Sequence, residues 1–197
     1  MRRLTHLGPE GAARMVDVSA KRPSVRTASA RAVVSLGPRA YRALVASENV
    51  KGDALAVARL AGIQAAKRTA EWIPLCHPLV FDAVGLTVSR RPEGHAVEIR
   101  ATVRGTAKTG FEMEALVAAS AAALALYDMC KAADKGIVIG PVELVAKSGG
   151  KSGSWRRRPA TASLSRPPGP FGRERASRTG GGPPTGGGGN SSSRRPG

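Results

Sequence analysis

Apolar and polar residues alternate in several stretches of the chain, and this pattern predicts its strands. Val25–Leu36 alternates for much of its length, which is typical of a strand with one buried face. Val80–Ser89 and His95–Arg104 alternate in the same way, and the turn residues Arg91–Gly94 between them predict a hairpin. A last strand is expected over Ile137–Ala146, interrupted by a Gly-Pro pair.

The segments between these strands have the composition and the end signals of helices. A proline opens a short helix over Arg39–Ser47, since proline is favoured at early helical positions. Asp53 stands at the N-cap of a longer helix that runs to Thr69 and ends before a proline. Glu112–Asp134 is rich in Ala, Leu and Met and is therefore the strongest predicted helix.

The expected elements follow the order β, α, α, β, β, α, β. With the first two helices counted as one, this is the βαββαβ order of a ferredoxin-like sandwich, an α+β fold with an antiparallel sheet and helices on one face. We place this domain at residues 15–155, between a flexible N-terminus at 1–14 and a tail at 156–197. Because many unrelated functions occur on this architecture, it does not indicate the chemistry.

The tail differs sharply in composition from the domain. Residues 156–197 hold nine Arg, no Lys and one Glu among many Gly, Pro and Ser. Such a segment cannot bury enough apolar surface to offset its ordering entropy, so we expect it to be disordered. A basic tail can bind nucleic acid non-specifically, but the same composition can reflect coding bias without any partner.

The net charge of +17 divides into +8 in the tail (nine Arg minus one Glu) and +9 in residues 1–155. A domain with this excess of positive charge suits a small polyanion such as a triphosphate.

Cysteine usage and hydropathy indicate the compartment. Cys76 and Cys130 are too far apart for a disulfide framework or a zinc site, so we expect reduced thiols, no bound metal and a cytoplasmic protein. Met1–Arg14 lacks the apolar segment of a secretory signal, and no run approaches the 18 apolar residues of a membrane span. No membrane association is expected.

Two short motifs could present reactive side chains. Lys51-Gly52-Asp53 precedes a predicted helix, where N–H groups and the helix dipole attract phosphate and Lys51 adds a cation. A helix cap beside an exposed lysine explains the same residues. Pro74–Pro78 is a loop stiffened by two prolines that carries His77, and such a loop can position a side chain for proton transfer. A histidine held by hydrogen bonds under a helix end explains this loop equally well.

Four charged residues lie on the strongest predicted helix or at its entry. Asp128 and Lys131 are three positions apart and therefore neighbours on one face, as an acid–base pair or as a solvent-facing ion pair. Glu112 and Glu114 stand at the other end, and a continuous helix would separate Glu114 from Asp128 by about 21 Å. Either these residues do not share a site, or the site straddles a subunit interface.

Lys147–Gly153 contains Gly-Lys-Ser, but it does not fit a P-loop. That motif requires a glycine five positions before Gly150, where this chain has Val145, and no helix pattern follows. The segment is interpreted instead as a Gly-rich strand end with two lysines, able to contact phosphate through a backbone nest.

Taken together, several segments resemble one family, the cyclic pyranopterin monophosphate synthases of the MoaC type. They occur in the family's order over residues 15–155. The matching stretches are Met15–Ser19, Lys51–Asp53, Ala58–Lys67, Ile73–Leu79, Lys108–Leu116, Tyr127–Ala132 and Lys147–Gly153.

The resemblance implies an activity and an assembly. Enzymes of this family are lyases of molybdenum cofactor biosynthesis that convert a cyclised dihydroguanosine triphosphate into cyclic pyranopterin monophosphate and release diphosphate. They have ferredoxin-like folds and form homohexamers, trimers of dimers, with sites between subunits, which agrees with the distance argument above. The resemblance implies no tightly bound cofactor, and Mg²⁺ accompanying the diphosphate is left open.

The resemblance also assigns residues. Asp128 corresponds to the catalytic acid or base, Lys131 is its neighbour, and Lys51 and His77 handle proton transfers and the triphosphate. The expected substrate contacts and further pocket members are Leu75, Cys76, His77, Glu112, Met113, Glu114, Arg26, Lys147 and Asp17. Proton shuttles for ring opening and cations for a departing diphosphate suit this set.

One departure and two alternatives are noted. Phe111 stands where the family usually has a smaller aliphatic residue, which could alter the shape of the pocket. A ferredoxin-like nucleic-acid-binding module with a basic tail would need aromatic side chains on its strands, and the predicted strands offer only Phe81. An inactive relative is disfavoured because every expected charged site residue is present.

Overall fold

The structure is a computed structural model, and it describes residues 11–46 and 52–158. The compact unit that contains them ends at Pro159. The strands are β1 (Ser24–Ser35), β2 (Ala83–Arg91), β3 (Ala96–Ala107), β4 (Val138–Ser148) and β5 (Trp155–Arg156). The helices are α1 (Gly37–Val45), α2 (Ala54–Lys67), α3 (Thr69–Trp72), the 3-10 turn η1 (Pro92–Gly94) and α4 (Glu112–Cys130).

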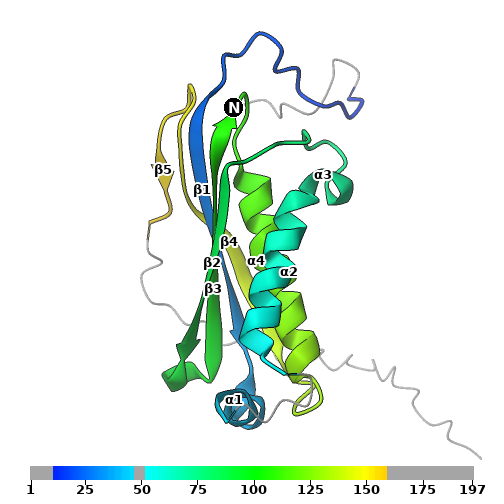
Figure 1. The fold of residues 1–197 in the computed structure, drawn as a ribbon, viewed down its shortest axis with the longest axis vertical. Coiled ribbons are helices and arrows are strands. Elements are labelled where there is room, and N and C mark those ends of the chain that lie inside the picture. The colour runs from blue at the N-terminus through cyan, green and yellow to red at the C-terminus, as the bar shows by residue number, and fades with distance from the viewer. Residues whose placement is uncertain (1–10, 47–51, 159–197) are drawn as a thin grey trace, which may run out of the picture. The chain divides into compact units, whose positions relative to one another are not determined.

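The strands form one antiparallel sheet in the order β2-β3-β1-β4-β5. Helices α2 and α4 cover one face of this sheet, and the other face carries no helix in the described part of the chain (Figure 1). The predicted α+β sandwich, with an antiparallel sheet and helices on one face, is confirmed.

The alternation in the sequence corresponds to the two faces of β1. Ala28, Ala30, Ala32 and Val34 are almost fully buried under the helices. The residues between them point to the uncovered face, where Ser29 Oγ shares a hydrogen bond of 2.8 Å with Thr102 Oγ1 of β3. A period of two therefore separates core from surface, as expected for a half-buried strand.

Small residues let the two long helices pack closely. A Cβ at Gly62 of α2 would lie 2.8 Å from the carbonyl oxygen of Ala118 in α4, so only glycine fits this crossing without a shift. Helix α4 is long and apolar enough to span a membrane by length and composition, which corrects the expectation that no segment approaches this threshold. Because 61% of its most apolar stretch is buried inside the domain, α4 serves as the core helix.

Several predicted boundaries were wrong. Strand β4 continues through Gly140-Pro141, and the irregularity is absorbed by a shift in its pairing with β1 rather than by an interruption. The second predicted helix breaks at Arg68, whose φ of −116° and ψ of 16° are not helical, and restarts as α3. Helix α4 ends at Cys130 instead of Asp134, and β2 begins at Ala83 instead of Val80.

The predicted start of the tail also changes. Arg156 lies in β5, a strand that was not predicted, and the structure describes the chain as far as Arg158. The remaining tail residues, 159–197, lie outside the described residues, as do 1–10 of the expected flexible N-terminus and 47–51, which include Lys51.

Candidate active site

A pocket of about 480 Å³ lies between the loop after α3 and the start of α4. The loop is held at Cys76, whose backbone N–H donates to the Ile73 carbonyl at 3.0 Å. Five of the predicted site residues line this pocket. Its lining is Ile73, Leu75, Cys76, His77, Thr109, Gly110, Glu112 and Met113.

The Cys76 thiol stands in front of a buried carboxyl group. Glu114 is only 2% exposed, and Cys76 Sγ lies 3.9 Å from its Oε1. The other oxygen, Oε2, is buried and has no hydrogen-bond partner among the described residues. An unpartnered carboxylate oxygen in the interior is costly, which works against the ionisation of Glu114.

These surroundings raise the pKa of both Glu114 and Cys76. Burial raises the pKa of Glu114, and the neighbouring charge of Glu112 raises it further. Burial, then the charge and hydrogen bond of Glu114, raise the pKa of the Cys76 thiol to about 11. At neutral pH the pocket wall therefore holds a thiol rather than a thiolate.

Lys147 reaches the pocket rim from the sheet. Its position in β4 is paired with Ala28 of β1, which faces the helices, and its Nζ lies 3.0 Å from Glu112 Oε1. Lys147 Nζ also donates to Ser152 Oγ at 3.0 Å, and the Lys147 and Glu112 side chains are each 28% exposed. A half-buried cation is thus held by one carboxylate and one hydroxyl.

Arg26 is fixed near the same end of the sheet. Its Nε donates to the Ala107 carbonyl at 2.9 Å, and its Nη2 donates to the Lys108 carbonyl at 3.2 Å. Gly149 and Gly150 have positive φ angles of 94° and 71° and pass close to Arg26. A Cβ at Gly150 would overlap the guanidinium, which explains the glycine.

Asp17 lies on the exposed segment that precedes β1. Hydrogen bonds from Ser19 lower its pKa, and Lys108 and His77 add smaller favourable charges. Lys108 Nζ donates to the Ser19 carbonyl at 3.1 Å. Asp17 is therefore linked through Ser19 to Lys108, which directly precedes the pocket residue Thr109.

Asp128 and Lys131 lie at the opposite end of α4. Lys131 Nζ lies 2.7 Å from Asp128 Oδ1, and their side chains are 49% and 54% exposed. The hydrogen bond and charge of Asp128 raise the pKa of Lys131. Lys51 lies outside the described residues, and α1 and the first turn of α2 lie at the same end of the domain as Asp128 and Lys131 (Figure 1).

Within one chain the structure therefore does not bring all the predicted residues together. Helix α4 is continuous from Glu112 to Cys130, so Glu114 and Asp128 are separated by about 21 Å along its axis. The first cluster, called here the thiol end, contains Asp17, Arg26, Leu75, Cys76, His77, Glu112, Met113, Glu114 and Lys147. The second, the Asp128 end, contains Asp128 and Lys131.

Sequence reasoning missed some members of the thiol end. Ser152, Lys108, Thr109 and Gly110 contact or line it, although no role was predicted for them. All four lie inside the motifs Lys108–Leu116 and Lys147–Gly153, which was the available signal. Phe111, by contrast, is fully buried and packs edge to face against Phe81, so its bulk lies in the core and not in the pocket lining.

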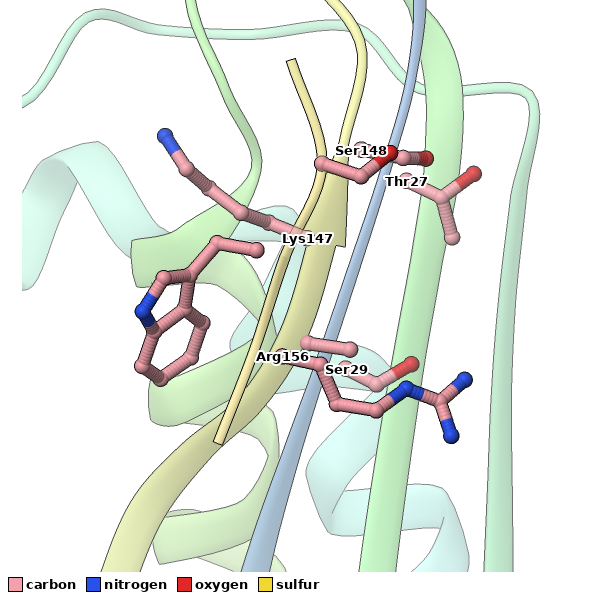
Figure 2. A pocket seen from close by; sticks show the side chains of 8 residues that line it. Thr27, Ser29, Lys147, Ser148 and Arg156 are labelled. Atoms are coloured by element: carbon pink, nitrogen blue, oxygen red, sulfur yellow. The ribbon is translucent and has the colours of Figure 1, made fainter. Parts of the chain in front are cut away.

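A second hollow, of about 410 Å³, lies beside β1, β4 and β5 (Figure 2). Its lining includes Thr27, Ser29, Ser148 and Arg156. Lys147 is the one predicted site residue that also lines this hollow. Within residues 11–46 and 52–158, no group of three or more His, Cys, Asp and Glu side chains could hold a metal ion.

The fold and the pocket together define a class, an α+β domain with a pocket lined by carboxyl, thiol and imidazole groups. Residues 15–150 match the model of the MoaC family. This match covers more than half of the 197-residue chain, and the chain belongs to the MoaC family. Membership places it in an enzyme family of molybdenum cofactor biosynthesis.

Proposed function

We propose that this chain is a cyclic pyranopterin monophosphate synthase, a lyase that converts cyclised dihydroguanosine triphosphate into cyclic pyranopterin monophosphate and diphosphate. The observation that carries the proposal is the pocket of about 480 Å³, where Cys76, His77 and Glu112 converge. Family membership supports the pathway, and the pocket supports the kind of substrate.

The cations at the thiol end suit the triphosphate. Lys147 and Arg26 are held by Glu112, Ser152 and backbone carbonyls before any ligand arrives. Preorganised cations of this kind stabilise the negative charge that develops on a leaving diphosphate without reorganising during the reaction. The Glu112 carboxylate keeps Lys147 extended at the pocket rim until a phosphate group replaces it.

Proton transfers are assigned to His77, Asp128, Lys131 and Lys51. Closing the cyclic phosphate forms a bond between a substrate hydroxyl oxygen and the α-phosphorus, breaks the bond to diphosphate, and releases the hydroxyl proton to a base. His77 lines the pocket, and histidine is the side chain that most often serves as a general acid or base. Asp128, hydrogen-bonded to Lys131, is the second acid–base group.

The site is proposed to form between two copies of the chain. Because α4 separates its two clusters, one copy can supply the thiol end and a neighbour the Asp128 end of the same site. This arrangement agrees with a homohexamer built as a trimer of dimers. A cytoplasmic location and Mg²⁺ bound with the diphosphate belong to the same proposal.

The test is an assay of diphosphate release and pterin formation from cyclised dihydroguanosine triphosphate. Replacing Lys51, His77 or Asp128 by Ala is expected to lower kcat by about 10²–10⁴-fold, the usual contribution of a general acid or base. Lys135→Ala and Asp82→Ala, at exposed positions outside both clusters, serve as matched controls. Wild-type rates in all three site variants would show that the assignment is wrong.

A further inference from the structure

The hairpin formed by β4, the loop Gly149–Gly153 and β5 contacts both cations of the thiol end, since it carries Lys147 and its loop passes Arg26. Lys147 is paired with Trp155 across this hairpin, and its Nζ reaches back to Ser152 Oγ in the loop. Gly150 of the loop passes against the Arg26 guanidinium. The positions of both cations therefore depend on where the loop lies.

The end of the hairpin is fixed by Arg157. Its backbone N–H donates to the Val145 carbonyl at 2.8 Å, and its Nε donates to the Leu144 carbonyl at 2.8 Å. The same Nε lies 3.1 Å from Glu143 Oε2. A strand of only two residues has few ladder hydrogen bonds, so these contacts supply much of what holds it against β4.

Glu143 joins this contact to the rest of the sheet. Its Oε1 is paired with Arg31 Nε of β1, and its side chain is only 17% exposed. One carboxylate thus connects β1, which carries Arg26, with the residue that follows β5. Charge-assisted hydrogen bonds to a half-buried group of this kind are among the stronger ones.

We propose that Glu143 and Arg157 are positioning residues that latch the hairpin, so that its loop holds Lys147 and Arg26 ready for the triphosphate. The inference rests on the proposed function for the identity of the ligand. The family match ends at residue 150, so Glu143 lies inside the matched residues and Arg157 lies beyond them.

The neighbouring Arg156 provides a matched control. It is the last residue of β5, directly before Arg157, and it has the same side chain, yet this side chain extends to the opposite side from Lys147 (Figure 2). It makes no side-chain hydrogen bond or ion pair with another described residue. Removing Arg156 therefore leaves the latch intact, whereas removing Arg157 opens it.

The experiment measures binding of inorganic tripolyphosphate to the full chain by calorimetry, together with KM and kcat. Arg157→Ala and Glu143→Gln are each expected to weaken binding and to lower kcat/KM by roughly twofold to tenfold, because the same cations stabilise the charge on the leaving diphosphate. The double variant is expected to be no weaker than the weaker single one, since both remove the same contact. Gly150→Ala, which moves Arg26 directly, is expected to weaken binding at least as much.

Circular dichroism establishes that each variant is folded at the assay temperature. Affinity for tripolyphosphate that is unchanged in Arg157→Ala, or a loss that Arg156→Ala shares, would overturn the latch. An inactive wild-type chain would instead overturn the proposed function, while the binding comparison would still test the latch.

Discussion

The two ends of α4 differ in how firmly their charged groups are held. At the thiol end, Glu114 is buried against Cys76, and Lys147 is tied to Glu112 and Ser152. At the Asp128 end, the Asp128–Lys131 pair is about half exposed. A single chain therefore presents one end as a prepared pocket and the other as a charged surface.

This difference agrees with the proposed division of the site between two copies of the chain. The thiol end has a shaped cavity but lacks Asp128, and Asp128 stands at the far end of the same helix. A second copy that places its Asp128 end over the pocket would cover the exposed pair and complete the catalytic set. This division can be tested by mixing variants in one oligomer and by measuring the reactivity of side chains at each end.

Mixing two inactive variants gives the largest expected effect. His77→Ala and Asp128→Ala are each expected to lower activity by about 10²–10⁴-fold. If each site takes His77 from one copy and Asp128 from its neighbour, dissociating and reassembling the two variants together at equal amounts restores about a quarter of the wild-type rate. No recovery in oligomers shown by mass spectrometry to be mixed would place both residues in one chain's site.

The two cysteines, one at each end of α4, permit a second test. Because the pKa of Cys76 is raised from 9.0 to about 11, its alkylation by iodoacetamide at pH 8 is expected to be about a hundredfold slower than that of an ordinary thiol. The rate should rise about tenfold per pH unit, since the thiolate is the reacting form and remains a minority below pH 11.

Peptide mass spectrometry separates Cys76 from Cys130, which is 1% exposed in the core. Glu114→Gln removes the nearby charge and is expected to speed alkylation of Cys76 alone. A Cys76 thiol that reacts as fast as a free cysteine would mean that the thiol end is not shielded as described.

The sequence predicted the elements with strong local patterns. The alternation through Ala28–Val34 and the Ala-rich run of α4 each repeat over many residues, so local periodicity was sufficient. Strand β5 was missed because two residues have no period, and the break at Arg68 was missed because the residues on both sides favour a helix. At this break the Thr69 hydroxyl donates to the Ala66 carbonyl at 3.0 Å, a local side-chain hydrogen bond that has no signal in the apolar pattern.

For the site, the sequence predicted many of the residues but not the contacts between them. Motif matching gave most residues of the thiol end, and the helical rise alone indicated that Glu114 and Asp128 could not meet in one chain. The contact between Cys76 and Glu114, 38 residues apart, could not be predicted because it depends on how the loop after α3 folds over α4. The Glu143–Arg157 contact was missed because Arg157 was assigned to the tail.

The smallest expected effect is on the free energy of unfolding. It compares directly how firmly a lysine is held at each end of α4. Lys147→Ala removes a half-buried cation and leaves Glu112 without its ion-pair partner, so it is expected to lower the free energy of unfolding by about 0.5–1.5 kcal/mol. Lys131→Ala is expected to leave the melting temperature unchanged within error, because exposed pairs contribute little. Both variants are expected to lose activity. Thermal unfolding of the two variants side by side checks this expectation. An equal loss of stability would mean that Lys131 is held as firmly as Lys147. The distinction between a prepared pocket at one end and a charged surface at the other would then be wrong.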